Sequence, residues 1–186
     1  MLSLLLCSVL GEVELLNGPL FRDHVIKRRE NDIWLVLVVG LNHKKCHRAI
    51  KEFRRAETMV PGNAHFGIVN ITEEPLLAQR LDVSYLPMLK VFYPGGVDTP
   101  EVSPNVDGFL SALSDRMPNY VRIFDRHWAE EEMPSVVLFT DQTKVPTIWA
   151  SLSVHYRETY VRFGICSEFA LHREYSISRL PTVIFF

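Results

Sequence analysis

Cysteine is scarce in this chain of 186 residues, which contains three, at positions 7, 46 and 166. They form no Cys-x-x-Cys pair, and their spacing does not match a disulfide framework. A fold held together by several disulfides is therefore excluded, and so is an intact dithiol motif. So few thiols say little about the compartment in which the protein resides.

An excess of charge of one sign is also lacking, since the net charge is -2. Such a balance creates no long-range field that would attract nucleic acid. One basic cluster stands out, at residues 44–48, but it is soon followed by Glu52 and predicts a solvated face. We therefore expect no nucleic-acid partner.

The N-terminal apolar run, LSLLLCSVL at residues 2–10, is far too short to span a bilayer. Its length suits the apolar part of a secretory signal, and Val9-Leu10-Gly11 is acceptable as a cleavage site. The basic segment that normally precedes such a run is missing. Residues 1–12 are thus either a signal segment or plain buried chain, and a membrane anchor would have to lie outside this sequence.

The apolar content of 47% and the charged content of 23% are those of a folded globular protein. Apolar runs predict strands at 13–16, 34–39, 66–71, 88–93 and 97–102. Helical spacing and capping residues predict helices at 19–26, 45–56, 72–81 and 106–113. In the third helix we expect Thr72 as the N-cap and Leu76, Leu77 and Leu81 on the buried side. Interleaved strands and helices predict an α/β fold with a mixed central sheet covered on both faces.

An internal repeat is the most informative feature of the sequence. The run WLVLV at 34–38 corresponds to SVVLF at 135–139, FGI at 66–68 to FGI at 163–165, and SYLP at 84–87 to SRLP at 178–181. A linker at 114–120 separates the copies. We expect one domain at 13–116 and a second at 121–186 that lacks its last strand and helix, as in a fragment or a short isoform. The alternative is one continuous sheet.

The second copy has its own helix signals. Pro146 begins a predicted helix whose apolar face contains Ile148, Trp149, Leu152 and Tyr156. Ser167 is the expected N-cap of a helix that ends near Glu174. Trp128 could anchor a partner at the surface, but a large aromatic beside an apolar strand favours the core.

The segment 34–53 is where chemistry is expected. A buried strand leads through a polar loop at 42–45 into a helix with Cys46, Ala49, Ile50 and Phe53 on one apolar face. The free N–H groups and the macrodipole at a helix start favour a thiolate, which is how redox cysteines are usually activated. A packed, inert thiol is favoured over an activated one, however, because Cys46 lies on the apolar face.

These residues resemble the thioredoxin superfamily, specifically the tandem thioredoxin-like domains of protein disulfide isomerases and their endoplasmic-reticulum relatives. The family pattern WLVxFxAxWCxxC aligns without gaps with residues 34–46, and its VDxxxxxxLAxxF segment is similar to residues 69–81. Its cis-proline loop resembles Leu86-Pro87 and Leu180-Pro181. The second copy is similar to the non-catalytic second thioredoxin-like domain of ER J-proteins. The resemblance implies two tandem thioredoxin-like domains and an ER lumenal or lumenal-side location.

Departures from the family pattern bear on the activity. His43 stands in the place of the attacking cysteine, Asn42 in that of the preceding tryptophan, and Leu37 in that of the buried acid. The corresponding loop of the second copy, residues 141–145, has no cysteine. Because a dithiol couple needs a second thiol to resolve the mixed disulfide, turnover as an oxidase or reductase is not expected.

The resemblance implies a binding module that engages polypeptide clients or partners in a chaperone role, without a cofactor. Its substrate-binding residues would be His43, Lys44, Lys45, Tyr85, Leu86 and Pro87. The alternative is a monothiol exchange enzyme or client trap with Cys46 as its catalytic residue.

Histidine suggests a third, weaker kind of site. His43, Cys46 and His47 have a spacing that could hold Zn²⁺, but no fourth ligand is near in sequence and a buried Cys46 would turn His47 away, so we expect no metal. The remaining histidines show no mutual spacing and are expected at the surface or partly buried: His24, His65, His127, His155 and His172.

Overall fold

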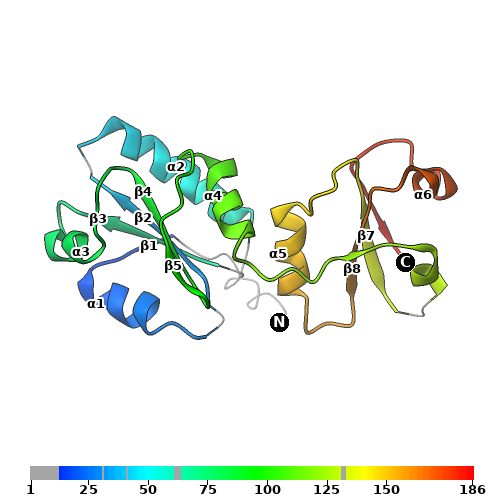
Figure 1. The fold of residues 1–186 in the computed structure, drawn as a ribbon, viewed down its shortest axis with the longest axis horizontal. Helices are drawn as coiled ribbons and strands as arrows, with labels where there is room; N and C mark the ends of the chain where they lie inside the picture. Colours follow the sequence, from blue (N-terminus) through cyan, green and yellow to red (C-terminus); the bar gives the residue numbers. More distant parts are fainter. Residues whose placement is uncertain (1–12, 31, 41, 61–63, 131–132) are drawn as a thin grey trace, which may run out of the picture. The chain divides into compact units, whose positions relative to one another are not determined.

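The computed structural model describes residues 13–30, 32–40, 42–60, 64–130 and 133–186 (Figure 1). The chain divides into two compact units, unit 1 (Met1–Met117) and unit 2 (Pro118–Phe186), and each has its own mixed sheet. The candidate signal segment 1–12 lies outside the described residues. Among the helices that are described, none is both long enough and apolar enough to cross a membrane.

Unit 1 has a five-stranded sheet in the order β1-β3-β2-β4-β5. The strands β1, β3 and β2 are parallel, and β4 and β5 are antiparallel to their neighbours. The elements, in chain order, are β1 (Glu14–Leu15), α1 (Gly18–Leu20), the π-helical η1 (Phe21–Ile26), β2 (Trp34–Val39), α2 (Lys44–Thr58), β3 (His65–Asn70), α3 (Pro75–Arg80), β4 (Met88–Tyr93), β5 (Gly96–Asp98) and α4 (Val106–Ser114).

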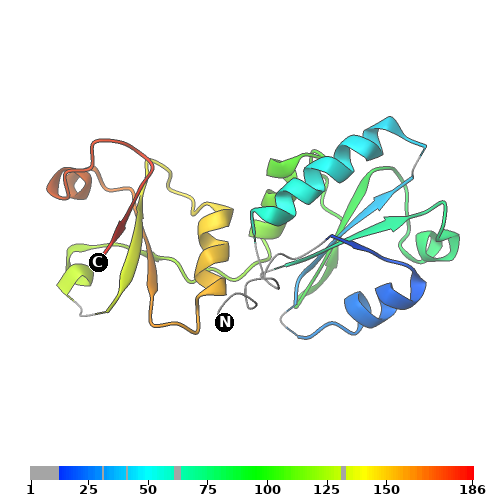
Figure 2. The same cartoon turned by 180° about the vertical axis from the view of Figure 1, so that it is seen from behind.

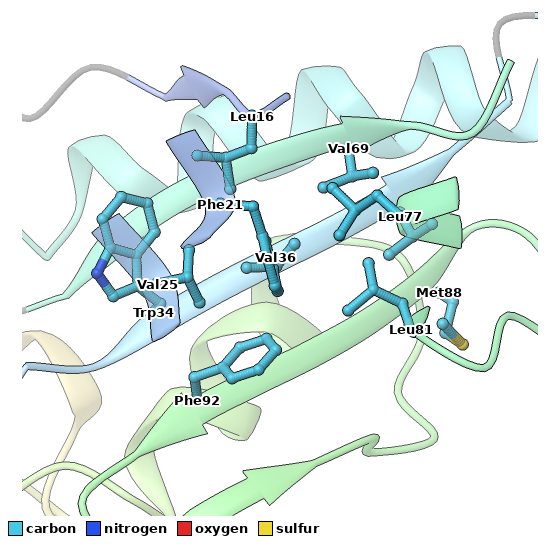
Figure 3. Close-up of a cluster of buried hydrophobic side chains, with 11 residues drawn as sticks. Leu16, Phe21, Val25, Trp34, Val36, Val69, Leu77, Leu81, Met88 and Phe92 are labelled. Carbon is cyan, nitrogen blue, oxygen red and sulfur yellow. The ribbon is translucent and has the colours of Figure 1, made fainter. Parts of the chain in front are cut away.

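The central strand β2 is buried along its whole length because helices cover both faces of the sheet. On one face, side chains from β2 pack with residues of η1 and α3, and Figure 3 shows this cluster around Val36. On the other face, Phe53 of α2 makes an edge contact with Phe109 of α4, with ring centroids 5.0 Å apart. The long apolar run that predicted a buried strand at 34–39 therefore forms the middle of a three-layer unit.

Unit 2 has a four-stranded sheet in the order β6-β8-β7-β9, with β9 antiparallel to β7. Its elements are β6 (Arg122–Ile123), the 3-10 helix η2 (Arg126–Glu130), β7 (Ser135–Phe139), α5 (Thr147–His155), β8 (Arg162–Cys166), α6 (Phe169–Glu174) and β9 (Thr182–Phe185) (Figure 2). Trp128 is buried beside Phe124, so its assignment to the core is confirmed. Trp149 is also buried, and its indole N–H donates to the carbonyl of Gly164 at 2.9 Å.

Several details of the helices differ from the expectations. The helix α3 begins at Pro75 rather than after Thr72, because Asn70 Oδ1 accepts the amide of Thr72 and holds a turn there. In the helix that results, Leu77 and Leu81 share the buried side, whereas Leu76 lies about 100° around the helix from Leu77 and is exposed.

The two helices of unit 2 also differ from the sequence patterns. The helix α6 is preceded by Glu168 rather than capped by Ser167, since its first turn begins at Phe169. On α5, Ile148 and Tyr156 are exposed although they were expected on the apolar face with Trp149. The face of α5 that contacts the sheet is therefore narrower than its apolar spacing indicates.

The repeat allows β4 and β9 to be compared position by position. Leu89 and Val91 on β4 are 3% and 0% exposed, and their counterparts on β9, Val183 and Phe185, are 42% and 80% exposed. In unit 1 this face of the sheet is covered with the help of α4, and β5 pairs with the outer edge of β4. Within the described part of unit 2, no strand pairs with the outer edge of β9.

Candidate functional site

The loop between β2 and α2 holds the residues for which chemistry was expected. His43 is the N-cap residue of α2, with an extended backbone, and its side chain makes no capping hydrogen bond. The amide of Cys46 donates to the carbonyl of His43 at 2.9 Å. His43 and Cys46 therefore occupy the outer and inner positions of one tight turn, three residues apart.

Cys46 is completely buried, at 0% exposure. Ala49 and Phe53, on the same side of α2, are buried to the same extent, whereas Ile50 is only half-buried. The geometry of Cys46 is that of a packed thiol, because a substrate disulfide would have to reach a sulfur with no surface open to solvent.

The polar residues next to Cys46 in sequence are exposed: His43, Lys44, Lys45 and His47. The two histidines whose spacing with Cys46 could hold Zn²⁺ are therefore open to solvent, whereas the Cys46 side chain is not. Throughout the portion of the chain that the structure describes, no group of three or more His, Cys, Asp or Glu side chains is placed to hold a metal ion.

A glycine that the sequence patterns did not single out brings this loop against the proline loop before β4. A Cβ atom built on the buried Gly40 would lie 3.2 Å from Leu86 Cδ1 and 3.4 Å from the His43 ring, so all three residues meet at one point. A glycine directly after a buried strand is a sequence signal for such a close approach. The structure thus brings His43 and Leu86 together.

The proline loop presents its polar and aromatic edge to solvent. The peptide bonds Leu86–Pro87 and Leu180–Pro181 are both cis, as the family resemblance implied. Tyr85 is exposed, whereas Leu86 and Pro87 are half-buried. Of the expected substrate-binding residues, His43 and Leu86 therefore lie against Gly40, and His43, Lys44, Lys45 and Tyr85 are exposed.

An apolar side chain stands at the position where the family pattern has a buried acid. Leu37 is buried in the middle of β2, between Ile68 of β3 and Leu89 of β4. A carboxylate at this depth could accept a proton from a resolving thiol, and an isobutyl group cannot. Position 37 thus supplies no proton acceptor.

Unit 2 has one thiol, and it is packed in the core. Burial raises the pKa of the Cys166 thiol, so it stays protonated and unreactive at neutral pH. His172, expected at the surface or partly buried, is fully buried instead, with Nε2 donating to the carbonyl of Cys166 at 3.1 Å. Its ring also makes an edge contact with Phe139. Both side chains serve packing rather than exchange chemistry.

His24 and His65 of unit 1 are far apart in the sequence, but the fold brings them to the same end of the sheet. His24 Nδ1 lies 2.9 Å from a carboxylate oxygen of Glu14, and the rings of Trp34 and His65 stack with centroids 4.8 Å apart. His65 Nε2 lies 4.0 Å from Asp32 Oδ2. The parallel register, which pairs Trp34 with His65, brings these residues to the end of the sheet opposite the His43 loop.

Comparison with known proteins shows the fold. No family model and no curated protein sequence matches this chain. It is similar to the structures of ERdj5 form I (16% identity, TM-score 0.75) and full-length ERdj5 (17%, 0.73), which cover 93% of this chain but only 26% and 28% of theirs. The first two thioredoxin domains of Naumovozyma dairenensis Eps1p align over 94% of this chain and 86% of that one, at 14% identity and a TM-score of 0.50.

The expectation of a thioredoxin-like α/β fold is therefore confirmed. A zinc-bound form of human ERp44 also aligns, with 13% identity, a TM-score of 0.51, and coverage of 94% of this chain and 56% of that one. This chain spans about a quarter of the length of the ERdj5 chains that it matches. At such identities the likeness extends to the fold and not to the activity.

Proposed function

We propose that this chain is a redox-inactive thioredoxin-like module of a secretory-pathway protein and that it binds polypeptide clients or partners. The observation that carries the proposal is the burial of Cys46. This thiol, in the first turn of α2, is fully buried, and the outer position of the motif is occupied by His43. Two tandem thioredoxin-like domains, the second without its last strand and helix, and a location in the ER lumen belong to the same proposal.

The chemistry of disulfide exchange supports the first part. A thiolate must attack a disulfide sulfur, and a second thiol must then resolve the mixed disulfide. Among the described residues the free thiols are Cys46 and Cys166, both buried and in different units. The apolar side chain of Leu37 also cannot accept a proton from a thiol, as a carboxylate at that position could. A mixed disulfide at Cys46 would be hard to form and would have no partner thiol to release it.

The shape of the site supports polypeptide binding. Tyr85 is exposed at the edge of the proline loop, and the backbone there is able to pair with an extended peptide. Lys44 and Lys45 are exposed in the first turn of α2 and add positive charge next to His43. The alignment with two consecutive thioredoxin domains of Eps1p supports the tandem arrangement.

A reductase assay tests the proposal. We expect the purified chain to reduce insulin disulfides no faster than its Cys46→Ser variant, with both at the rate of the uncatalysed reaction with dithiothreitol. An active thioredoxin serves as the positive control. If the unmodified chain were faster and the excess were lost in Cys46→Ser, the module would be an enzyme and the proposal would be wrong.

The monothiol alternative makes a different prediction about Cys46, which lies in the first turn of α2. From its burial we expect native Cys46 to react with iodoacetamide at pH 7.4 at least about a hundredfold more slowly than in the denatured chain. Peptide mapping by mass spectrometry would separate it from the other two thiols. The exposed position of Lys44, in a Lys44→Cys variant, supplies a fast-reacting control. Rapid native labelling of Cys46 would favour the monothiol enzyme.

A further inference from the structure

The end of unit 1 opposite the His43 loop contains a pocket of about 580 Å³. Because α2 starts beside the last residue of β2 and runs back along the sheet, its last turns lie at the first residue of β2 (Figure 1). The pocket is lined there by Glu14 of β1, Trp34 of β2, Arg54 and Glu57 of α2, and His65 of β3. Its volume is within the range of pockets that bind small ligands or single side chains.

Glu57 is unusual among the described acidic residues. It is only 9% exposed, and it is the only buried acid of those described. Its carboxylate forms no hydrogen bond or ion pair with any of the described residues, although it lines the pocket. By contrast, Glu52 on the same helix pairs with Arg55 at 3.0 Å, and Glu14 pairs with His24. A carboxylate that lines a pocket and has no partner among the described residues is open to pairing with a cation that enters the pocket.

The electrostatics of Glu57 agree with its position. Burial removes water from the carboxylate and raises the pKa of Glu57 above its ordinary value of 4.5, and no neighbouring cation offsets this effect. Arg54 also lines the pocket, but its side chain is exposed and makes no ion pair with Glu57. When it is ionised, Glu57 therefore gives the pocket a negative charge that solvent screens less well than the charge of a surface carboxylate.

We propose that this pocket binds the alkylammonium or guanidinium group of a lysine or arginine side chain from a partner polypeptide, with Glu57 as its counter-ion. Such a group supplies several N–H donors to the free carboxylate oxygens. The exposed His65 ring, stacked on Trp34, gives a flat surface on which a guanidinium can lie. An uncharged or anionic side chain would leave Glu57 buried and unpaired.

The adjoining depression helps to locate the cation. This second pocket, of about 500 Å³, shares Glu14, Trp34 and His65 with the first. Its charged side chains are balanced when Glu14 is counted, because three are acidic and three are basic: Glu14, Asp23, Asp32, Lys27, Arg28 and Arg29. Asp23 is paired with Lys27 at 2.7 Å. The unpaired carboxylate belongs to the first pocket alone, so the cation is expected beside Glu57.

The test uses the whole chain and N-acetylarginine amide as the probe, followed by ¹H–¹⁵N NMR. We expect saturable shifts at Glu57, His65 and the Trp34 indole, with a Kd on the order of millimolar, as for a single side chain. N-acetylcitrulline amide, which has the same shape without the charge, should bind at least about tenfold more weakly. Equal binding of both probes, or no saturable shifts at 20 mM arginine probe, would overturn the proposal.

Two variants assign the binding to Glu57. Glu57→Gln should weaken binding of the arginine probe at least about tenfold, whereas Glu52→Gln, a carboxylate removed elsewhere on α2, should leave it unchanged. Undiminished affinity in Glu57→Gln would show that another group holds the cation. The comparison of arginine with citrulline on the unmodified chain does not depend on how well either variant folds.

A stability measurement separates lost binding from lost structure. The pKa of Glu57 is higher in the folded than in the unfolded state, so the folded state binds more protons and stability falls as the pH rises through this region. At pH 7 we therefore expect Glu57→Gln to unfold at a higher denaturant concentration than the unmodified chain, with the gain shrinking towards pH 4. A Glu57→Gln variant that is less stable at pH 7 would mean that Glu57 already has a partner, against the proposal.

Discussion

The substitution His43→Cys is expected to give this chain a redox-active disulfide. Residue 43 caps α2 and its carbonyl accepts the amide of Cys46, so the two side chains start from adjacent corners of one turn. Residues three apart in a helical turn have Cα atoms about 5 Å apart, which is within the range for a disulfide. The introduced thiol would also occupy the exposed position at the helix N-terminus, where a thiolate is favoured.

The measurement is the thiol content of the variant in a glutathione redox buffer. We expect His43→Cys to lose two thiols and 2 Da on oxidation, and to return to the dithiol on reduction. Lys44→Cys is the matched control, because an exposed thiol two residues from Cys46 points to another side of the helix and cannot bridge to it. A His43→Cys protein that stayed fully reduced alongside Lys44→Cys would show that the turn does not have the geometry of a dithiol site.

The activity of the same variant should also rise. Insulin reduction by His43→Cys is expected to exceed that of the unmodified chain at least about tenfold, since both exchange steps then have a thiol. Leu37 should keep the rate below that of an active thioredoxin, because no buried acid accepts the proton from Cys46. The unmodified chain and Cys46→Ser are the baselines.

The substitution Gly164→Ala is expected to destabilise unit 2 strongly. A Cβ atom on Gly164 would overlap the six-membered ring of Trp128 and lie 2.7 Å from its Cη2 atom. The ring cannot easily move, because Phe124 packs against it and the Arg162 guanidinium lies 4.8 Å from its centroid. We expect a loss of about 3 kcal/mol in the free energy of unfolding, the upper part of the usual range for overpacking.

The repeat supplies the control for this prediction. Gly67 of β3 is the counterpart of Gly164, and its added Cβ would meet the tip of the Leu16 side chain, which can change rotamer. Gly67→Ala is therefore expected to cost only about 1 kcal/mol. Urea denaturation followed by tryptophan fluorescence measures both, since Trp34 reports on unit 1 and Trp128 and Trp149 on unit 2. Equal losses in the two variants would mean that the Trp128 ring is not held in place.

The parts of the fold that depend on long apolar runs could be predicted from the sequence. The strand 34–39 has the bounds that its apolar run predicted. A strand buried on both faces is apolar at every position, so its own residues mark where it begins and ends. The helix beginning near residue 45 and the packing of Cys46 follow from local spacing in the same way. Short elements were less predictable: the three leucines at 76, 77 and 81 look equivalent in sequence, and only the start of α3 at Pro75 decides which one is exposed.

The pocket beside Glu57 could not be predicted, and the reason is physical. Its walls come from β1, β2, α2 and β3, so its residues meet only when the parallel register sets His65 beside Trp34. In the sequence, Glu57 is one of two acids on a charged helix, and nothing local shows that it lacks a partner. Similarly, the burial of His172 results from the packing of α6 against β7 and not from any periodicity.

The exposed face of β9 affects the lifetime of the whole chain in the presence of proteases. Exposed apolar side chains and unpaired edge amides lower the free energy needed for a strand to detach, and a detached strand is a substrate for proteases. Degradation starts at the region that opens most easily, so the half-life of unit 1 is tied to that of unit 2 as long as the two are joined. A ligand or partner that covers Val183 and Phe185 would therefore protect both units, including the turn of unit 1 that contains Cys46.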